Sequence, residues 1–420
     1  MDDDHLAAIA ARYGTPTYVY DLDRVEAQVA RLRAAFSGAE IHYAVKANAN
    51  GALLRHLAGL GLGVEALTAG ELERALRAGF APERILLGGP GHTPALVARA
   101  TEAGVGCVSL DGEGAWRLWR EADLEGTRFL VRVNPGFDPR THEHLATAAP
   151  HAKFGVPPER ATALAAEVAS AGQLAGFHVH AGSMIAEPDV ARLVVEALAP
   201  LYDRFPDLDM VDFGGGFAVP DAPLAAFAER FLPFAQERGL RLVLEPGRFV
   251  VADAGILLTH VLHVKHGPLR HVIADAGMAD LLRPALYGAR HPVRVVTTGA
   301  RPDSGPEKRP DTPPDTRTDT RLDTPPGQGH RPGAVPTDVD GPLCENADRL
   351  ARGVELPDVG PGDLLAVGRA GAYGFGMASN YASSLRPAEV VTQRGVAHLA
   401  RRRETPEDLW RLEDEAERTA

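Results

Sequence analysis

The sequence is short of several features that mark specialised classes of protein. It has only two cysteines, Cys107 and Cys344, among 420 residues, which excludes a disulfide-stapled secreted scaffold. No apolar run reaches the ~20 residues that a membrane-spanning helix needs. Residues 1–5 are mostly acidic and no apolar segment follows them, so a signal peptide is not expected. We therefore expect a protein of the reducing cytoplasm.

Excess positive charge is also missing. The chain carries a formal net charge of −12, and its isoelectric point is near 5.7. Such a chain repels phosphate backbones and anionic lipid surfaces, so we expect neither a nucleic-acid partner nor a membrane. The hydrophobic content of 45% allows a large core, and the length predicts two or three domains, or one barrel with an appended domain.

One local pattern recurs between residue 41 and about residue 250. A short apolar or β-branched run is followed by a Gly- or Asn-rich turn and then by a stretch with helical periodicity. Eight such units indicate an α/β fold with a closed, TIM-like (β/α)8 barrel over residues 22–255, more readily than an open doubly wound sheet. The expected strands are residues 41–46, 63–67, 84–88, 106–110, 128–133, 175–180, 209–213 and 241–245.

The pattern changes after residue 255, where strand-like runs follow one another without intervening helices. This predicts an antiparallel β-sandwich or β-barrel domain over residues 256–395. We assign residues 1–21 to the same domain, because the run Thr17–Asp21 has the same strand-like character. The charged, helix-prone segment 396–420 is expected to form a tail that packs on the surface.

Residues 300–334, inside the β domain, have an unusual composition. They are rich in Pro, Asp, Thr and Arg, with one Leu and no aromatic residue. Such a segment cannot bury enough apolar surface to offset the entropy lost on ordering. We expect a disordered insertion, and a tether that binds a partner is the alternative interpretation.

Lys46 is the first candidate for chemistry. The run 41–46 (IHYAVK) delivers one amine into a polar, Asn-flanked turn. Burial lowers the pKa of a lysine, which leaves a neutral amine able to form a Schiff base. Taken alone, Lys46 is more easily interpreted as a solvated lysine at a strand end.

Other strand ends carry groups that suit the same chemistry. In a (β/α)8 barrel the carboxyl ends of all strands meet at one rim. His180 ends the sixth expected strand and Glu245 ends the eighth, with Arg248 three residues later. The triple-glycine turn 214–216 follows the seventh. Singly, these are a core histidine, a tight turn and a structural ion pair. Together they predict an active site at the rim.

Pyridoxal phosphate fits this set of residues. Gly214, Gly215 and Gly216 lack Cβ atoms, so their backbone N–H groups can approach a phosphate. Ser183 can offer a hydroxyl to the same phosphate. A carboxylate such as Glu245 beside the pyridine nitrogen would keep that nitrogen protonated and strengthen the ring as an electron sink.

The motifs that carry these residues resemble those of the fold-type III pyridoxal-phosphate-dependent decarboxylases. This is the ornithine, diaminopimelate and arginine decarboxylase group, whose barrel is of the alanine racemase type. The similarity spans residues 12–395, and the second domain resembles the diaminopimelate subgroup, since the ornithine and arginine relatives have Asp, not Glu, after the cysteine. The barrel motifs are HYAVKAN, VRVNPG, KFG, HAGS, DFGGGF and EPGR, and those of the second domain are DAGMADLLRPALY (275–287), GPLCENAD (341–348) and GAYGFGMASNY (371–381).

The resemblance implies a role for each matching residue. The expected catalytic residues are Lys46, which would form the Schiff base, and Cys344, which would protonate the carbanion. The expected cofactor contacts are Lys46, His180, Ser183, Gly214, Gly215, Gly216, Glu245, Gly247, Arg248 and Tyr373. The expected substrate contacts are Arg248, Arg283, Tyr287, Glu345 and Tyr373, and no metal ion is expected.

These roles imply decarboxylation of meso-2,6-diaminopimelate to L-lysine and CO2, the last step of lysine biosynthesis, with pyridoxal 5′-phosphate as cofactor. In the family, Cys344 and Glu345 would reach into the site of a neighbouring subunit, so a homodimer with shared active sites is expected. Met184 departs from the family pattern, which usually has Gln there. A decarboxylase of ornithine, arginine or a carboxylated polyamine precursor is one alternative. A noncatalytic pyridoxal phosphate carrier is another, although it would not need the second domain.

Overall fold

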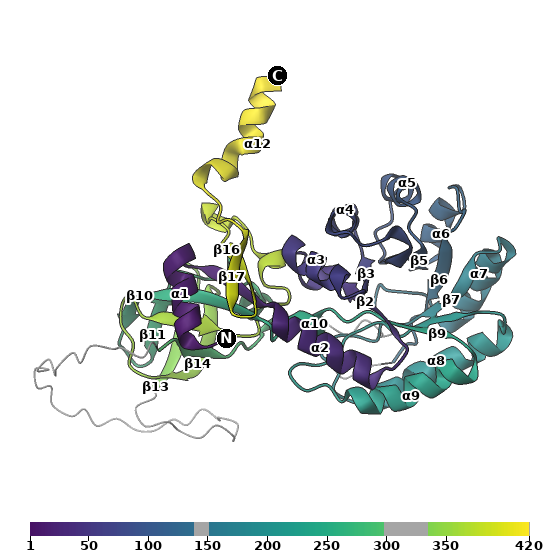
Figure 1. The fold of residues 1–420 in the computed structure, drawn as a ribbon, viewed down its shortest axis with the longest axis horizontal. Helices are drawn as coiled ribbons and strands as arrows, with labels where there is room; N and C mark the ends of the chain where they lie inside the picture. Colours follow the sequence, from purple (N-terminus) through teal and green to yellow (C-terminus); the bar gives the residue numbers. More distant parts are fainter. Residues whose placement is uncertain (138–150, 298–334, 420) are drawn as a thin grey trace, which may run out of the picture.

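The barrel predicted from the sequence is present. The computed structural model describes residues 1–137, 151–297 and 335–419, and Figure 1 shows a helix-wrapped barrel beside a β-rich unit. All eight expected strands are confirmed, and they close in sequence order with parallel pairing throughout. They are β2 (Glu40–Ala44), β3 (Gly63–Ala66), β4 (Ile85–Leu87), β5 (Cys107–Leu110), β6 (Arg128–Arg132), β7 (Leu174–His178), β8 (Met210–Asp212) and β9 (Arg241–Leu244).

Helices cover the outside of the barrel (Figure 1), and local sequence signals set their ends. They are α2 (Leu22–Ala35), α3 (Gly51–Gly59), α4 (Ala69–Ala78), α5 (Pro94–Ala103), α6 (Glu113–Trp119), α7 (Pro158–Ser170), α8 (Asp189–Arg204), α9 (Leu224–Glu237) and α10 (Arg248–Val251). Asn50, Thr68 and Thr93 cap α3, α4 and α5, because their side chains accept hydrogen bonds from N–H groups of the first turn. Gly79 and Gly104, in the left-handed conformation, end α4 and α5.

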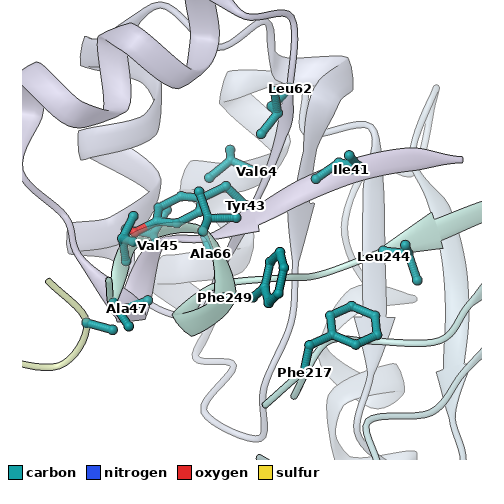
Figure 2. Close-up of a cluster of buried hydrophobic side chains, with 14 of the residues drawn as sticks. Ile41, Tyr43, Val45, Ala47, Leu62, Val64, Ala66, Phe217, Leu244 and Phe249 are labelled. Atoms are coloured by element: carbon teal, nitrogen blue, oxygen red, sulfur yellow. The ribbon is translucent and has the colours of Figure 1, made fainter. Parts of the chain in front are cut away.

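The barrel core fixes the turn that carries Lys46. This turn is the 3-10 helix η1 (Val45–Ala47), and both Val45 and Ala47 are buried. Figure 2 shows them in one cluster with Tyr43 and other apolar side chains of the core. Each fully buried large apolar side chain contributes roughly 1.5–3 kcal/mol to folding, so the turn has little freedom to move.

The second unit is a nine-stranded sheet with the order β14-β13-β11-β10-β1-β16-β17, in which β15 pairs with β10 and β12 with β15. The strands are β1 (Thr17–Asp21), β10 (Gly255–Lys265), β11 (Arg270–Ala274), β12 (Val293–Val295), β13 (Val335–Asp340), β14 (Arg349–Leu356), β15 (Leu364–Val367), β16 (Ala388–Gln393) and β17 (Val396–Arg401). The expected pairing of the N-terminal strand with this sheet is confirmed, since β1 lies between β10 and β16.

The expectation of wholly antiparallel pairing is wrong. β1 runs parallel to β16, and β11 runs parallel to β13, so the sheet is mixed. The reason is that neither pair is joined by a hairpin, and a strand brought from a distant part of the chain is free to insert in either direction.

Several elements of the second unit were not foreseen. α1 (Asp3–Tyr13) packs Leu6, Ile9 and Ala10 against the sheet. The short helix α11 (Arg283–Tyr287) follows β11, and η4 (Phe375–Met377) and η5 (Tyr381–Ser383) are single 3-10 turns. A further 3-10 turn, η2 (Pro82–Arg84), lies in the barrel just before β4. β17 continues the sheet beyond residue 395, where we expected it to end. The expected insertion at 300–334 lies outside the described residues.

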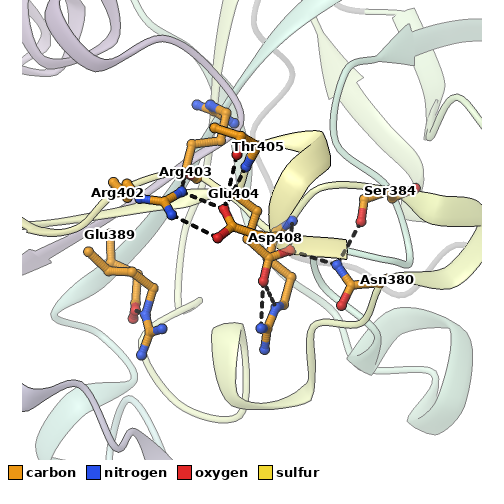
Figure 3. Close-up of polar contacts among 10 residues, drawn as sticks. Asn380, Ser384, Glu389, Arg402, Arg403, Glu404, Thr405 and Asp408 are labelled. Atoms are coloured by element: carbon orange, nitrogen blue, oxygen red, sulfur yellow. Dashed lines mark hydrogen bonds and ion pairs between the residues drawn. The ribbon is translucent and has the colours of Figure 1, made fainter. Parts of the chain in front are cut away.

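The C-terminal segment contains the expected helix, α12 (Pro406–Thr419), but the helix does not pack on the surface. In Figure 1 it extends away from the rest of the chain, and every residue from Trp410 to Thr419 is exposed. Figure 3 shows the contacts at its base, where Arg402 pairs with Asp408 at 2.5 Å. Because α12 is mostly charged, it offers too little apolar surface for stable packing on its own chain. Within the described residues, no helix is long and apolar enough to cross a bilayer.

Candidate active site

Lys46 lies in η1, two residues beyond the end of β2. Its Nζ is 2.9 Å from Oε2 and 3.1 Å from Oε1 of Glu65, a buried residue of β3. Burial alone lowers the pKa of Lys46, but Glu65, with smaller contributions from Tyr373 and Glu245, raises it above the usual value. The lowered pKa expected from the sequence is therefore wrong, because a buried carboxylate holds the lysine as an ammonium ion.

Glu245 follows β9 and forms a buried carboxyl pair with Asp212 of β8. Burial raises the pKa of Asp212 to about 7, and burial together with the Asp212 charge raises the pKa of Glu245 well above its usual value. Two carboxyl groups so placed share a proton, because both cannot ionise together. Oε1 of Glu245 and Oδ2 of Asp212 have no hydrogen-bond partner among the described residues, so this pair suits a positively charged N–H donor.

Two histidines of the β7 end flank Glu245. Nδ1 of His178 is 2.7 Å from Oγ of Ser109, and its Nε2 is 3.5 Å from Oε2 of Glu245. Nδ1 of His180 is 4.0 Å from the same carboxylate oxygen and accepts the N–H of Gly215 at 3.2 Å. Burial lowers the pKa of both histidines well below the usual value, and nearby cations add to the effect. Both imidazoles are therefore neutral.

The triple-glycine turn tolerates no side chain. Gly214 and Gly216 have φ of +63° and +85°, and a Cβ on Gly215 or Gly216 would lie 2.2 Å or 2.1 Å from a main-chain oxygen. The N–H of Gly214 donates to Asp212 at 2.7 Å, and that of Gly215 donates to His180. Two of the three donors that we expected to face a phosphate are thus used inside the protein, which leaves the N–H of Gly216 for that role.

Arg248 joins the barrel rim to the β domain. Its Nε and Nη2 donate to Oγ of Ser183 at 3.2 and 3.0 Å, and its guanidinium lies 4.7 Å from the centre of the Tyr373 ring. Tyr373 has φ of +55°, and its N–H donates to the carbonyl of Ala47 in η1 at 2.7 Å. A Cβ on Gly247 would lie 2.9 Å from that of Ala47, so glycine is needed for the close approach of this segment to η1.

Arg283 begins α11 and donates from Nη1 to Nε2 of His291 at 3.2 Å. Burial lowers the pKa of Arg283 to about 10, and repulsion from Arg248 contributes to the fall. Tyr287 is near enough to both arginines to raise their pKa values. Among the residues that the structure describes, no carboxylate pairs with either guanidinium, which makes them suited to an anionic ligand.

Cys344 and Glu345 lie on the loop between β13 and β14, and both are exposed. Buried Asp348 fixes this loop, because its carboxylate accepts a backbone N–H of the same loop and the N–H of Met278, each at 2.6 Å. Glu345 accepts a hydrogen bond from the hydroxyl of Tyr381, within the β domain. Within one chain, therefore, the described contact of Glu345 is with the β domain and not with the barrel rim that carries the other site residues.

Sequence reasoning missed three residues of the buried network: Glu65, Asp212 and His178. Each stands in or at the end of an apolar barrel strand, where a charged or polar side chain is costly unless it is paired. A search for polar residues inside the predicted parallel strands would have found them, since such strands are otherwise nearly continuous apolar runs.

The residues present fit pyridoxal phosphate. The rim offers a lysine amine, a buried carboxyl pair whose oxygens without a partner among the described residues suit the ring nitrogen, and the imidazole of His180, 4.0 Å from Glu245. It also offers a side-chain-free turn next to the Arg248–Ser183 pair, which suits the phosphate. Fold and site together define a pyridoxal-phosphate-binding barrel with a second β domain.

Comparisons with known proteins agree with this class. Residues 22–252 match the family described as pyridoxal-dependent decarboxylase, pyridoxal binding domain. A diaminopimelate decarboxylase of Deinococcus radiodurans is 38% identical over 409 residues, which cover 96% of this chain and 97% of that protein. One of Pseudomonas aeruginosa is 38% identical over 427 residues, which cover 96% and 94%.

Solved structures extend the likeness to the whole chain. The crystal structure of diaminopimelate decarboxylase from Helicobacter pylori complexed with L-lysine has a TM-score of 0.85 at 31% identity, and it covers 98% of this chain and all of that one. A lysine/ornithine decarboxylase from Vibrio vulnificus, 19% identical with a TM-score of 0.77 over 94% of this chain and 98% of that one, shares the fold. The chain belongs to the diaminopimelate decarboxylases within the pyridoxal-dependent decarboxylase family.

Proposed function

We propose that this protein decarboxylates meso-2,6-diaminopimelate to L-lysine and CO2, the last step of lysine biosynthesis. It is a carboxy-lyase that depends on pyridoxal 5′-phosphate. When bound, the cofactor supplies the electron sink that makes the loss of CO2 possible. The protein binds and orients both molecules, excludes water and delivers a proton.

The guanidiniums of Arg248 and Arg283, which pair with no carboxylate in the part of the chain that the structure describes, are the observation that carries this proposal. Meso-diaminopimelate has a carboxylate at its distal end, and planar guanidiniums bind carboxylates well. Ornithine has no such carboxylate and would leave two partly buried cations without a partner, which is costly. Arginine would add a third guanidinium to the same place. The site therefore favours the diaminopimelate substrate over the diamine precursors.

Each rim residue would contact a different part of the cofactor. Lys46 would bind it covalently, and Glu65 fixes the amine at 2.9 Å before that bond forms. Glu245, which shares a proton with Asp212, would face the ring nitrogen. His180, kept neutral by burial, would lie against the ring without adding a competing charge.

At the substrate end, Arg248, Arg283 and Tyr287 would hold the distal carboxylate, and Glu345 would accept a hydrogen bond from the distal ammonium. Cys344 would deliver the proton that replaces CO2. We propose that Cys344 and Glu345 act on the barrel of a second subunit, in a homodimer with shared active sites. Their exposed position on one chain supports this arrangement. We also propose that the enzyme works in the cytoplasm, the compartment we expect from the sparse cysteines.

The test is to load purified protein with pyridoxal phosphate and offer meso-diaminopimelate, ornithine, arginine and L-lysine in turn. We expect one CO2 and one L-lysine per molecule of meso-diaminopimelate, and no CO2 from the other three. Lys46→Ala is the inactive control. Release of CO2 from ornithine or arginine, with none from meso-diaminopimelate, would contradict the proposal. Cofactor binding with no CO2 from any substrate would instead favour a carrier.

A further inference from the structure

His291 is a buried histidine next to Arg283, with 3% of its surface exposed. Its Nε2 is 3.2 Å from Nη1 of Arg283, and its Nδ1 is 2.9 Å from the main-chain oxygen of Gly368. A guanidinium and a carbonyl group thus contact the two ring nitrogens, and both contacts have hydrogen-bond length.

These two partners permit one protonation state of the imidazole. A guanidinium has only donors, so Nε2 must accept with its lone pair. A carbonyl oxygen only accepts, so Nδ1 must carry the proton. His291 is therefore the neutral tautomer protonated at Nδ1.

The backbone on the Gly368 side is rigid. Gly368 follows β15, and its N–H donates to the carbonyl of Pro292 at 2.8 Å. The next residue, Val293, pairs with Val367 in the sheet. His291 is thus held at both its side chain and its neighbouring backbone.

The helix that carries Arg283 is less firmly held than this backbone. α11 has five residues, and none of them is buried. A helix of this length gains little stability from its own hydrogen bonds. The hydrogen bond to His291 gives the Arg283 guanidinium its direction.

We infer that His291 is a positioning residue for substrate recognition: it accepts a hydrogen bond from Nη1 of Arg283 and aims the rest of the guanidinium at the distal carboxylate of the substrate. This rests on the proposed function, since the carboxylate is that of diaminopimelate. An aspartate in place of His291 would orient Arg283 equally well but would neutralise it. A neutral acceptor leaves the charge and the remaining N–H donors for the substrate.

The charges around His291 keep it in this state. Burial lowers its pKa to about 4, and the facing cations Arg283, Arg248 and Arg369 act in the same direction, while the carbonyl of Gly368 opposes them. The imidazole therefore stays an acceptor for Arg283 at neutral pH.

Two substitutions separate the contacts of His291. In His291→Asn, the amide N–H reaches the Nδ1 position and keeps the bond to Gly368 but loses the acceptor for Arg283. In His291→Gln, the amide oxygen reaches the Nε2 position and keeps that acceptor. His42→Asn is the matched control, because His42 is a buried histidine of β2 that is 3.6 Å from Glu40.

The first readout is ligand binding to the pyridoxal-phosphate-loaded protein. The affinity for L-lysine, which keeps the distal carboxylate, is expected to fall about tenfold in His291→Asn, roughly the effect of losing one hydrogen bond. His291→Gln and His42→Asn should stay within about threefold of wild type. The affinity for 1,5-diaminopentane, which lacks the carboxylate, should not change in any variant. KM for diaminopimelate should rise in His291→Asn with little change in kcat, because the lost contact is made in ground and transition states alike.

Unchanged L-lysine binding in His291→Asn would overturn the inference, and so would equal weakening of 1,5-diaminopentane, which marks general damage. The second readout needs no variant. ¹⁵N NMR of cofactor-free, histidine-labelled protein at pH 7 should show His291 protonated at Nδ1, and a proton on Nε2 would refute the proposed contact. A protein that fails to turn over diaminopimelate would refute the proposed function and leave this tautomer result intact.

Discussion

Replacing Glu65 by Gln is expected to lower the pKa of Lys46 by about 1.5 pH units. At 2.9 Å and an effective dielectric constant of 20, the Coulomb energy of this ion pair is about 6 kcal/mol. The side chain of Lys46 is 30% exposed, so solvent screening and the cost of burying Glu65 reduce the net effect to about 2 kcal/mol. In Glu65→Gln, burial still lowers the pKa of Lys46, and the Glu65 charge no longer opposes it. Tyr373 and Glu245 still raise this pKa.

Competitive acetylation of the cofactor-free protein across a pH series, read by mass spectrometry of the peptide that carries Lys46, measures this pKa. Glu73→Gln is the matched control, because Glu73 pairs with Arg99 at 2.5 Å on the exposed surface of the barrel helices. It should leave the titration of Lys46 unchanged. An unchanged or higher pKa of Lys46 in Glu65→Gln would refute the argument that Glu65 holds the lysine as an ammonium ion.

Three further outcomes are expected. Arg283→Ala should lower kcat/KM for meso-diaminopimelate roughly a hundredfold, because a charged contact with the substrate is lost. The dissociation constant of pyridoxal phosphate should stay within about threefold of wild type. An equal loss of catalytic efficiency and of cofactor affinity would show that Arg283 is not a substrate contact. Mixed Lys46→Ala and Cys344→Ala proteins, each inactive alone, should regain about a quarter of wild-type activity after subunit exchange, because a heterodimer has one intact shared site; no recovery would place both residues in one subunit's site. Burial lowers the pKa of His291 to about 4, below its value in the unfolded chain, so the unfolded state takes up the proton first. The free energy of unfolding should therefore fall by about 3 kcal/mol between pH 6.5 and 4, and a His291→Gln protein with the same pH dependence would contradict this assignment.

The barrel could be predicted because its strands are short apolar runs at regular spacing, each followed by a turn and a helical stretch. Buried parallel strands leave this signal in a single sequence. β13 and β14 leave a weaker one, since Val335–Asp340 and Arg349–Leu356 mix polar and apolar residues. Their pairing depends on neighbours that are distant in the chain, and so does the parallel direction of β1 beside β16.

In the candidate site, too, some features could be predicted from the sequence and others could not. Lys46, His180 and Glu245 could be placed on one rim because all barrel strands end there. The direction of the pKa shift of Lys46 could not be predicted. It depends on Glu65, a residue one strand away in space and 19 positions away in sequence. The support of Arg283 by His291 was equally invisible, since it depends on the fold of the loop between α11 and β12.

The position of the cofactor is the central claim, and peptide mapping after borohydride reduction of the loaded protein tests it most directly. The chain has four lysines, Lys46, Lys153, Lys265 and Lys308, so an assignment is unambiguous. The account predicts one phosphopyridoxyl group per chain, on the peptide that contains Lys46, and none on the Lys46→Ala protein. A modified peptide that carries any of the other three lysines, with Lys46 unmodified, would contradict it.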